Sequence, residues 1–329
     1  MRVLVTGGAG YIGSHACKAL AAAGHEPIVY DNFIGGQRWA VRYGPLEEGD
    51  VADPGRLAEV MAKVKPEAVM HFAALISVGQ SVEEPELYYR TNVAGAVNVL
   101  AAVRAAGVPR LVFSSTGTVH GEPPRLPITE DMPLAPVSPY GRSKVMVELM
   151  LQDCAAATDL SGAVLRYFNA AGADPDGELG EAHDPETHLI PLLLAAARDG
   201  APFTINGDDY ATPDGTCIRD YIHVSDLAHA HVLALDALAG RTGVRAWNLG
   251  VGRGLSVKEI IVAAREVTGM PIEVRMGPRR PGDPPELYAD PSRARSELGF
   301  QPVHSDVRTI VETAWRWLID PPAHARPAG

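Results

Sequence analysis

Cysteine is scarce in this chain of 329 residues, which contains only Cys17, Cys154 and Cys217. The three are far apart and form no CxxC pair, so neither a disulfide framework nor a cysteine zinc site is indicated. Among eleven histidines the close pair is His229-Ala-His231. That stretch has a helical pattern, in which residues two apart point to different faces, so it is not expected to chelate. The sequence predicts no metal site.

Positive charge is also in short supply. The 29 Lys and Arg residues face 40 Asp and Glu residues, and the net charge is -11. This balance argues against a nonspecific nucleic-acid binder, which needs an excess of basic residues on one face. No apolar run approaches the ~20 residues of a membrane span, and the run before the first glycines is shorter than the ~7–15 residues of a signal-peptide core. We expect a soluble cytoplasmic protein without a nucleic-acid or membrane partner.

The first half of the chain alternates short apolar runs with longer helical patterns. Strands are expected at residues 3–5, 27–30, 68–72, 110–114 and 163–167. They are apolar nearly throughout, which is typical of parallel strands covered on both faces. Between them lie segments with helical spacing, such as Ile12, Ala16, Leu20 and Ala23. This alternation predicts an α/β fold with a doubly wound, Rossmann-like parallel sheet.

After about residue 170 the pattern changes. Residues 169–187 and 200–217 look loop-rich, helical patterns resume at 224–238, 257–268 and 307–318, and short strands are expected near 247–249 and 272–274. We expect residues 1–168 to form a dinucleotide-binding domain and 169–329 a smaller α/β substrate-binding lobe. Residues 222–250 are expected to pack back onto the first domain.

A glycine-rich turn follows the first strand and opens the first helix. Gly7, Gly10 and Gly13 have the spacing GxxGxxG. A dinucleotide needs a tight turn, backbone without Cβ atoms near the pyrophosphate, and a helix N-terminus facing the anion. The position between strand and helix favours this interpretation over a sharp turn without a ligand.

Asp31 closes the second strand. A carboxylate there can accept both ribose hydroxyls of adenosine and repels a 2′-phosphate, which predicts NAD rather than NADP. The alternative is an ordinary turn aspartate at the end of a strand. Asp50 and Val51, further along the chain, are candidates to bracket the adenine by analogy.

Tyr140 and Lys144 form the central candidate site. Ser138 and Pro139 are a plausible N-cap and first helical residue, so the tyrosine and lysine, four apart, share one helix face. A phenol titrates near ~10 and is a poor base at neutral pH. We expect the lysine ammonium, the helix N-terminus and an oxidised nicotinamide to lower the tyrosine pKa. The alternative is a surface tyrosine beside a solvated lysine.

Hydroxyl residues end the strand at 110–114. Ser114-Ser115-Thr116 lies at the carboxyl edge of the sheet, where ligands of doubly wound folds bind. Hydroxyls there can hydrogen-bond a substrate alcohol and its ketone. Capping or turn formation is the competing interpretation.

Together these segments resemble the UDP-glucose (UDP-galactose) 4-epimerase family of extended short-chain dehydrogenase/reductases. The resemblance rests on TGGAGYIG, HFAAL, SSTGTVHG, SPYGRSK, RYFNAAGA, GDDYATPDGTCIRDYIHVSDLA and RRPGD, and covers Arg2 to about Trp317. It implies that Tyr140 removes the proton of the sugar 4-hydroxyl while C4 passes hydride to NAD⁺. It also implies that Lys144 holds the nicotinamide ribose and that Thr116 serves where the family usually has serine. The 4-ketose then turns and takes the hydride back on its opposite face.

The resemblance also implies the binding residues. The residues assigned to NAD are Gly7, Gly10, Tyr11, Ile12, Gly13, Asp31, Asn32, Asp50, Val51, Phe72, Ala73, Ala74, Ser114, Tyr140, Lys144, Tyr167 and Phe168. The residues assigned to the UDP-hexose are Thr116, Asn169, Leu189, Arg219, Tyr221, Arg280, Asp283 and Leu287. The two arginines suit a diphosphate because the guanidinium forms forked, charge-assisted hydrogen bonds. A homodimer through helices near 92–107 and 139–157 is implied as well.

Some positions depart from the family pattern. Ile76 stands where many members have lysine, His120 replaces a tyrosine, and Leu287 lies where residue size governs access of 2-acetamido sugars. Other UDP-sugar 4-epimerases, acting on N-acetylhexosamines, pentoses or uronates, therefore stay open. A 4,6-dehydratase is disfavoured because Gly117 and Thr118 replace its Asp-Glu pair. A nucleotide sensor without turnover is disfavoured by the presence of Tyr140 and Lys144.

Overall fold

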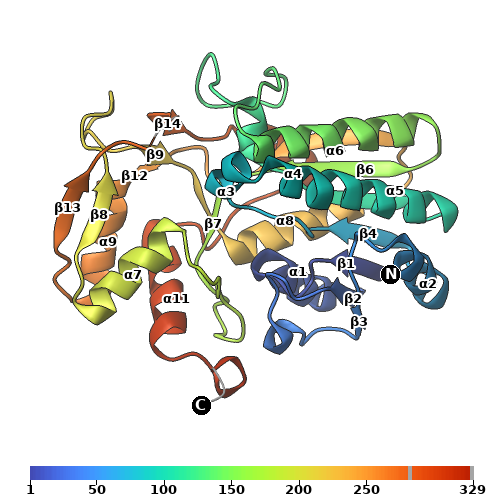
Figure 1. The fold of residues 1–329 in the computed structure, drawn as a ribbon, viewed down its shortest axis with the longest axis horizontal. Helices are drawn as coiled ribbons and strands as arrows, with labels where there is room; N and C mark the ends of the chain where they lie inside the picture. Colours follow the sequence, from blue (N-terminus) through green and yellow to red (C-terminus); the bar gives the residue numbers. More distant parts are fainter. Residues whose placement is uncertain (281–283, 327–329) are drawn as a thin grey trace.

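The computed structural model describes residues 1–280 and 284–326. A seven-stranded sheet with its helices occupies one side of the molecule, and the small sheets of the later chain and some of its helices form the other side (Figure 1). The large sheet has the order β11-β6-β5-β4-β1-β2-β3, and all its pairs are parallel. Its strands are β1 (Arg2–Thr6), β2 (Glu26–Asp31), β3 (Leu46–Glu48), β4 (Ala68–His71), β5 (Arg110–Ser114), β6 (Ser161–Arg166) and β11 (Gly243–Asn248).

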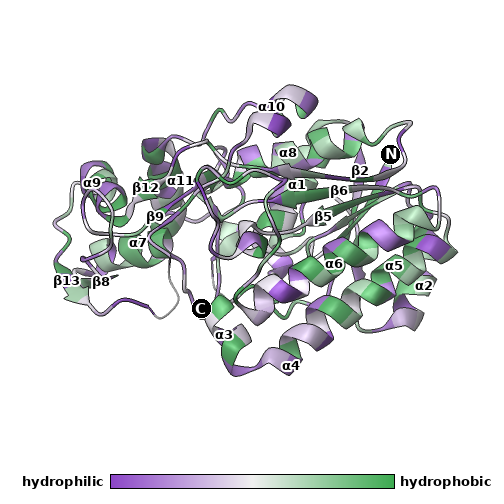
Figure 2. Cartoon of the chain, turned by 90° about the horizontal axis from the view of Figure 1, so that it is seen from above, coloured by the Kyte–Doolittle hydropathy of each residue, from purple (hydrophilic) through white to green (hydrophobic). Residues whose placement is uncertain are grey.

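Helices cover both faces of this sheet, because the side chains of each strand alternate between two cores. Val3 and Val5 of β1 belong to a core on one face, and Leu4 belongs to the core on the other. Figure 2 shows the sheet edge-on between the two helical layers. On one face lie α1 (Tyr11–Ala22), α8 (Val224–Ala237) and α10 (Ser292–Leu298); on the other lie α2 (Pro54–Val64), α5 (Gly95–Ala105) and α6 (Pro139–Ala156). The predicted doubly wound fold is confirmed.

The order of the strands reverses between β1 and β4. β1 pairs with β2 on one side and with β4 on the other, so the connections from these strands leave toward opposite faces. Ligands of doubly wound sheets bind at the carboxyl ends of the strands at such a point. The chain after β4 continues through α3 (Val78–Glu83), α4 (Pro85–Tyr88) and the π-helix η2 (Tyr89–Ala94) into α5.

The later chain builds a separate core. Leu193, Ile260 and Ile310, from three different helices, are all buried in it. Its helices are α7 (Leu189–Asp199), α9 (Val257–Thr268) and α11 (Val307–Ile319). Its strands pair as β7 (Asn169–Ala171) with β10 (Tyr221–His223), β8 (Phe203–Asn206) with β13 (Val274–Gly277), and β9 (Ile218–Arg219) with both β12 (Leu255–Ser256) and β14 (Glu286–Leu287).

The five strands predicted in the first half are present, with ends within two residues of those expected. The three helices predicted after residue 220 are present as well. β7 and β8, however, lie in stretches that were expected to be loops, and β3 and α7 were not predicted. β7 has three residues and exists through its pairing with β10, some fifty residues later, so it has no local signal. Within the described ranges, no helix is long and apolar enough to cross a bilayer.

Candidate active site

The loop between β1 and α1 folds tightly at three glycines. Gly7 has a φ of +73°, and a Cβ there would lie 2.6 Å from the backbone nitrogen of Ala73. Gly10 is the N-cap of α1, and its N–H donates to the carbonyl of Gly7 (3.1 Å). A Cβ on Gly13 would lie 2.1 Å from the same carbonyl oxygen. Glycine is therefore required for the N-terminus of α1 to pack against the end of β1.

Asp31 ends β2 beside this loop and is 6% exposed. Its carboxylate accepts hydrogen bonds from the backbone N–H of Ala9 (2.9 Å) and of Phe33 (2.8 Å). Burial raises the pKa of Asp31, and these hydrogen bonds oppose the rise. Asn32 donates to the carboxylate of Asp50 (2.9 Å). The polar groups that end β2 and follow β3 thus form one continuous edge next to the glycine loop.

Three further predicted cofactor residues flank this edge. Tyr11 and Ile12 open α1, and the Tyr11 hydroxyl donates to the carbonyl of Gly172 (2.6 Å). That bond ties the start of α1 to the segment after β7. Val51 is buried against the helical layer, and its carbonyl accepts from the Asn98 side chain of α5 (3.0 Å). Tyr11 and Val51 are thus each tied to a neighbouring segment by a hydrogen bond.

Phe72, Ala73 and Ala74 follow β4 directly. The N–H groups of Phe72 and Ala73 donate to the carbonyl of Thr6 at 2.9 and 3.1 Å. This keeps the segment beside the last residue of β1, where the glycine loop begins. Phe72 was expected as the last residue of this strand and follows it by one position, and the cofactor role of the three residues stays a prediction.

Asn92 is a site residue that the sequence analysis missed. It lies in the π-helix η2, is 2% exposed, and joins three segments. Its amide accepts from the N–H of Leu75 (2.8 Å), and donates to the carbonyl of Leu75 (3.0 Å) and to the hydroxyl of Ser143 on α6 (3.2 Å). A π-turn inside a helix is frequent at functional sites, but only the structure reveals it.

The end of β5 presents the hydroxyl groups predicted for the site. The Ser114 hydroxyl lies 2.5 Å from that of Tyr167, which follows β6. The carbonyl of Ser114 accepts from Nζ of Lys144 (2.8 Å). Thr116 is the N-cap of the 3-10 turn η3 (Gly117–His120), and its hydroxyl also hydrogen-bonds Tyr140. The capping role predicted as the competing interpretation is present, and the role of this hydroxyl toward the substrate stays a prediction.

The first turn of α6 carries the tyrosine and the lysine. Ser138 is the N-cap, its side chain accepts from the N–H of Gly141 (3.1 Å), and Pro139 is the first helical residue, as predicted. Tyr140 and Lys144 share one face, with Nζ 5.9 Å from the centroid of the phenol ring. Lys144 is only 4% exposed. The alternative of a solvated surface lysine is therefore wrong.

The predicted lowering of the tyrosine pKa is also wrong for the chain's own groups. Burial raises the pKa of Tyr140 to about 12, and the hydrogen bond from Thr116 opposes the rise without cancelling it. Burial lowers the pKa of Lys144 to about 8, with Glu148 opposing the shift. Desolvation is thus the largest cause of both shifts, and the groups that oppose it for Tyr140 do not include the ammonium group that was expected to stabilise the phenolate.

A buried ion pair anchors α6, the helix that carries Lys144. Glu148, one turn after Lys144, accepts from Nη2 (2.6 Å) and Nε (3.1 Å) of Arg166 at the end of β6. The hydroxyl of Ser115 donates to the same carboxylate at 2.5 Å. Both charged side chains are at most 4% exposed. These bonds join α6 to the ends of β5 and β6. Removing either charged partner would leave the other charge buried and unpaired, which strongly destabilises a protein.

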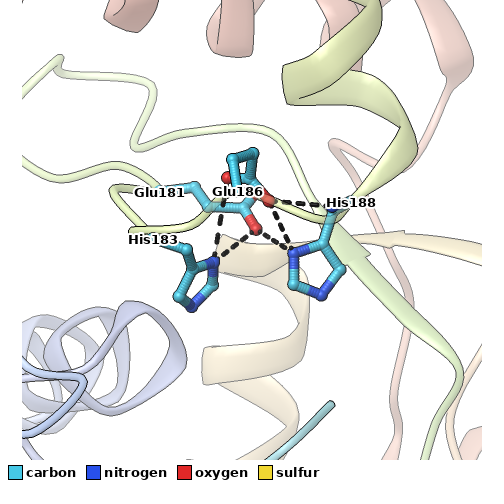
Figure 3. A group of neighbouring side chains, drawn as sticks. All are labelled: Glu181, His183, Glu186 and His188. Atoms are coloured by element: carbon cyan, nitrogen blue, oxygen red, sulfur yellow. Dashed lines mark hydrogen bonds and ion pairs between the residues drawn. The ribbon is translucent and has the colours of Figure 1, made fainter. Parts of the chain in front are cut away.

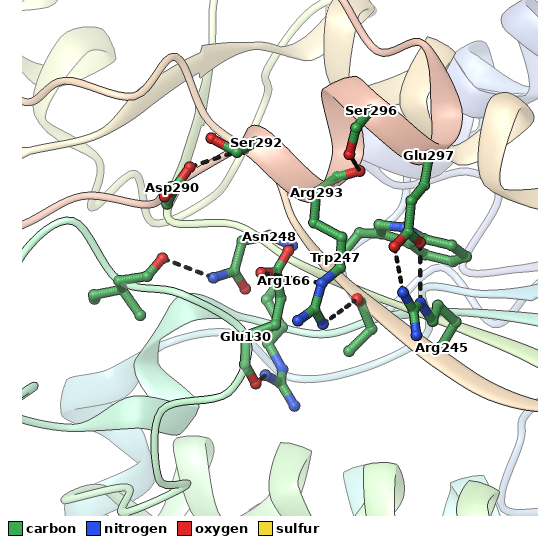
Figure 4. A network of polar contacts seen from close by, with 12 residues as sticks. Glu130, Arg166, Arg245, Trp247, Asn248, Asp290, Ser292, Arg293, Ser296 and Glu297 are labelled. Atoms are coloured by element: carbon green, nitrogen blue, oxygen red, sulfur yellow. Dashed lines mark hydrogen bonds and ion pairs between the residues drawn. The ribbon is translucent and has the colours of Figure 1, made fainter.

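A second polar network, drawn in Figure 4, holds the segment between η3 and α6 over the sheet. The Glu130 carboxylate accepts from the N–H of Asn248 (2.8 Å) and faces Nε of Arg293 (3.6 Å). The Asn248 amide donates to the carbonyl of Ile128 (2.9 Å). Arg166 reaches the carbonyl of Glu130 as well (3.3 Å). This segment is thereby tied to β6, β11 and α10.

The predicted substrate residues come from several elements, and strand pairing brings some of them together. Asn169 lies opposite Tyr221 in the β7–β10 pair, and Arg219 lies opposite Leu287 in the β9–β14 pair. The Asn169 amide donates to the carbonyl of Asp220 (2.9 Å). These four residues therefore form one group at the junction between the large sheet and the later chain.

The remaining predicted substrate residues stand further out. Leu189 is the first residue of α7, and Arg280 is exposed with Nε 3.0 Å from the Asn206 side chain. The Arg219 guanidinium donates to the carbonyls of Ile218 (2.7 Å) and Pro284 (2.8 Å). Asp283 lies outside the described residues.

One apolar cluster links the substrate side to the catalytic side. Leu287 is 7% exposed and is buried in a cluster with Ile128 and Met132, against which Phe168 packs. The ring of Phe168 lies so close to Gly117 that a Cβ there would be 2.3 Å from the ring. Gly117 follows Thr116, so the position predicted to control sugar size lies one side chain away from the hydroxyl turn.

Most of the chain matches a known protein family. Residues 3–250 match the model of the NAD dependent epimerase/dehydratase family. The chain belongs to that family. The matched part includes the glycine loop, Asp31, the β5 hydroxyl turn and the Tyr140–Lys144 pair. Its cofactor is NAD, as the sequence predicted.

The chain is similar over nearly its whole length to UDP-sugar 4-epimerases. The UDP-glucose 4-epimerase of Rhizobium leguminosarum bv. trifolii is 50% identical over 318 residues, which are 96% of each protein. The crystal structure of UDP-glucose 4-epimerase from Brucella ovis in complex with NAD is similar at a TM-score of 0.93 with 53% identity, covering 95% of this chain and 97% of that one. The UDP-Glc/GlcNAc 4-epimerase of Campylobacter jejuni is similar at a TM-score of 0.84 with 39% identity, covering 96% and 98%. The resemblance drawn from the motifs is confirmed.

The residues present fit NAD. At Gly7 and Gly13 a side chain would collide with backbone, which keeps the N-terminus of α1 open to an anion. Asp31 lies at the end of β2, where an acidic group suits ribose hydroxyls, and the N–H of Ala9 orients its carboxylate. Lys144 and Ser114 lie on the other side of β1 and β4, at the ends of β5 and α6. These donor and acceptor groups are thus spread along the strand ends at the reversal point, as an extended dinucleotide requires.

Proposed function

We propose that this protein interconverts UDP-galactose and UDP-glucose by inverting the configuration at C4 of the sugar. The observation that carries the proposal is the grouping of Tyr140, Lys144 and Thr116 at the strand ends beside the glycine loop. Full-length relatives of about half-identical sequence with this activity support it. The activity is that of an NAD-dependent isomerase of carbohydrate metabolism.

Bound NAD supplies reversible hydride acceptance at the C4 carbon. The chain's residues handle the proton. Tyr140 is the general base and acid at the 4-hydroxyl, and its phenol is held by the hydroxyl of Thr116. Lys144, fixed on the carbonyl of Ser114, places a positive charge on the same helix face. Because burial raises the pKa of Tyr140 to about 12, the phenol must first lose its proton before it can act as the base, and a cation close by favours the phenolate.

Binding of the two ligands divides between the two sides of the molecule. We assign NAD to the residues predicted from the glycine loop, the ends of β2, β4 and β5, and Tyr167 and Phe168. We assign the UDP-hexose to Asn169, Leu189, Arg219, Tyr221, Arg280, Asp283 and Leu287. The arginines carry the diphosphate, which leaves the hexose free to turn between its two faces. This assignment supports a division into an NAD-binding domain, residues 1–168, and a substrate lobe, residues 169–329, of which residues 222–250 pack back onto the first domain.

The proposal extends to assembly and location. We propose a homodimer formed by α5 and α6, and action in the cytoplasm. Nothing in the hydroxyl turn favours dehydration, because Gly117 and Thr118 cannot transfer the proton that elimination of water requires.

The test uses purified protein and UDP-galactose without added NAD, with UDP-glucose as the measured product. We expect turnover in the wild type, and Tyr140→Phe should lose at least ~100-fold, as is typical when a general base is removed. Tyr43→Phe is the matched control, because the Tyr43 hydroxyl bonds Glu178 away from the catalytic group. Its turnover should stay within a few-fold.

The affinity of Tyr140→Phe for UDP shows whether a loss of turnover comes from the chemical step or from ligand binding. Tyr140→Phe should bind UDP as the wild type does, since the phenol acts on the 4-hydroxyl of the sugar and not on the nucleotide. Unchanged turnover in Tyr140→Phe, or absence of product from the wild type loaded with NAD, contradicts the proposal.

A further inference from the structure

Two Glu-x-His pairs stand five residues apart in the loop between β7 and α7. They are Glu181-Ala182-His183 and Glu186-Thr187-His188. Their histidines, His183 and His188, are five residues apart, a wider spacing than that of the pair His229 and His231, so the sequence did not indicate them. The fold turns all four side chains toward one point, as Figure 3 shows.

The four ligand atoms lie at distances that suit a metal ion. The Glu181 Oε1 atom is 3.0 Å from Nδ1 of His183 and 2.8 Å from Nδ1 of His188. Glu186 offers Oε1 at 3.0 Å from Nδ1 of His188 and Oε2 at 3.9 Å from Nδ1 of His183. Ligands of a tetrahedral zinc ion with bonds of about 2.0–2.1 Å lie about 3.3–3.4 Å apart. The observed distances bracket that value.

The contacts within the cluster cannot all be hydrogen bonds at the same time. Nδ1 of His188 faces oxygens of both Glu181 and Glu186, although an imidazole nitrogen carries at most one hydrogen. A single oxygen of Glu181 likewise faces two imidazole nitrogens. A cation at the common point would engage all four groups at once.

Surrounding backbone orients the ligands. Oε1 of Glu186 accepts from the N–H groups of Thr187 (2.7 Å) and His188 (2.8 Å). Such outer contacts fix ligating carboxylates in metal sites. The Glu181 side chain is only 7% exposed, so its charge lies in the protein and requires a permanent partner.

A neighbouring acidic cluster shows the contrast. Asp174, Asp176 and Glu178 also converge, but Nζ of Lys18 lies between them at 2.7, 2.7 and 2.9 Å. That group already has a cation of its own. The Glu-x-His cluster is built from nitrogen and oxygen ligands around a point that the described side chains approach without such an ammonium group.

We propose that Glu181, His183, Glu186 and His188 bind one divalent cation of the zinc type as a closed, four-ligand structural site. Two imidazoles and two carboxylates are ligands that zinc accepts in tetrahedral geometry. The ring of His183 lies edge-on to Tyr11, with centroids 6.2 Å apart, and Tyr11 opens α1 at the glycine loop. The ion would therefore hold the loop before α7 against the nucleotide-binding turn.

The experiment uses the NAD-loaded enzyme, treated with a chelator and dialysed. Zn²⁺ is titrated by calorimetry, and Co²⁺ is used as a spectroscopic probe whose visible absorption reports tetrahedral coordination. We expect one ion per chain, a rise in Tm on binding, and a tetrahedral Co²⁺ spectrum. His183→Ala and Glu181→Gln should each weaken binding by more than ~100-fold, beyond the ~10–100-fold that the loss of an outer-shell contact costs.

His229→Ala is the matched control, because His229 is exposed on α8 and should leave binding unchanged. Glu181→Gln keeps the shape of the side chain, and its NAD content and circular dichroism show whether it is folded. Absence of stoichiometric Zn²⁺ binding in the wild type overturns the proposal, and the four side chains are then held together by hydrogen bonds alone. Binding that both variants retain overturns it as well.

Discussion

At the scale of single residues, the glycine loop shows how closely backbone approaches backbone. The oxygen of Gly7 lies where a side chain on Gly13 would begin. No rotamer can relieve such a contact, because both atoms belong to rigid backbone. The glycine is required by space rather than by its own dihedral angles, since Gly13 has helical neighbours on both sides.

Gly13→Ala should therefore destabilise the protein by about 1–3 kcal/mol, as overpacking does, and reduce the NAD retained through purification. Urea unfolding and the NAD content of the purified protein measure the two effects. Gly79→Ala is the control, because Gly79 is exposed in α3 with nothing within 4 Å of the added Cβ. It should be neutral or slightly stabilising. Equal stability of the two variants would contradict the packing argument.

The residues of the site divide into those with local signals and those without. Gly7, Asp31 and Tyr140 could be predicted because each stands at a fixed offset from a strand or a helix start. Asn92 and Glu148 could not, because their partners lie far along the chain; Asn92 bonds Ser143, 51 residues later. The pKa of Tyr140 was misjudged for a related reason, since its burial depends on segments brought together by the fold.

At the scale of elements, Asp220 is the joint between β9 and β10. Its carboxylate accepts from the N–H groups of Ala289 (3.1 Å) and Val251 (3.2 Å), beyond β14 and β11. Burial raises the pKa of Asp220 to about 7, and the two hydrogen bonds oppose the rise. Arg219 and Tyr221, both assigned to the substrate, flank it. The joint therefore positions the substrate strands while it holds a carboxyl group that resists ionisation.

The raised pKa predicts a pH dependence of stability. The folded state binds the Asp220 proton more tightly than the unfolded state does, so this group's contribution falls as the pH rises from about 4 to about 7. Asp220→Asn removes the titration, although its amide pairs less well with two N–H donors. Its free energy of unfolding relative to wild type should rise by up to about 2–3 kcal/mol between about pH 5 and about pH 7.

Urea unfolding across that range measures the difference. Asp159→Asn, at an exposed position, is the control and should show no slope relative to wild type. A difference between Asp220→Asn and wild type that does not change with pH would show that the carboxyl group is ionised throughout.

At the scale of the whole molecule, apolar side chains remain exposed on the outer helical layer. Val97 of α5 is 47% exposed, and Met146 and Leu149 of α6 are 41% and 49% exposed. Both helices lie on the same face of the sheet (Figure 2). Side chains of this kind gathered on neighbouring helices are typical of an interface between subunits, and they support the proposed homodimer.

Val97→Glu should convert the dimer to a monomer, because a second copy would bring two such charges into an apolar, two-fold contact. Sedimentation equilibrium gives the molecular mass directly. Val262→Glu is the matched control, since Val262 is a valine on α9 that is 52% exposed, in the other part of the molecule. The proposal is wrong if wild-type protein sediments as a monomer, or if both variants dissociate alike.

The large sheet also dictates when the molecule can finish folding. Its outermost strand on one side, β11, is residues Gly243–Asn248, and it pairs with β6, which ends some eighty residues earlier. Ribosomal synthesis therefore delivers six strands first and leaves β6 as an open edge until most of the polypeptide has emerged. An open edge of this kind recruits other strands. A fragment that stops after the first half of the chain carries Thr116, Tyr140 and Lys144 and yet keeps that edge uncovered, so only a chain that extends to Asn248 can complete the seven-stranded sheet.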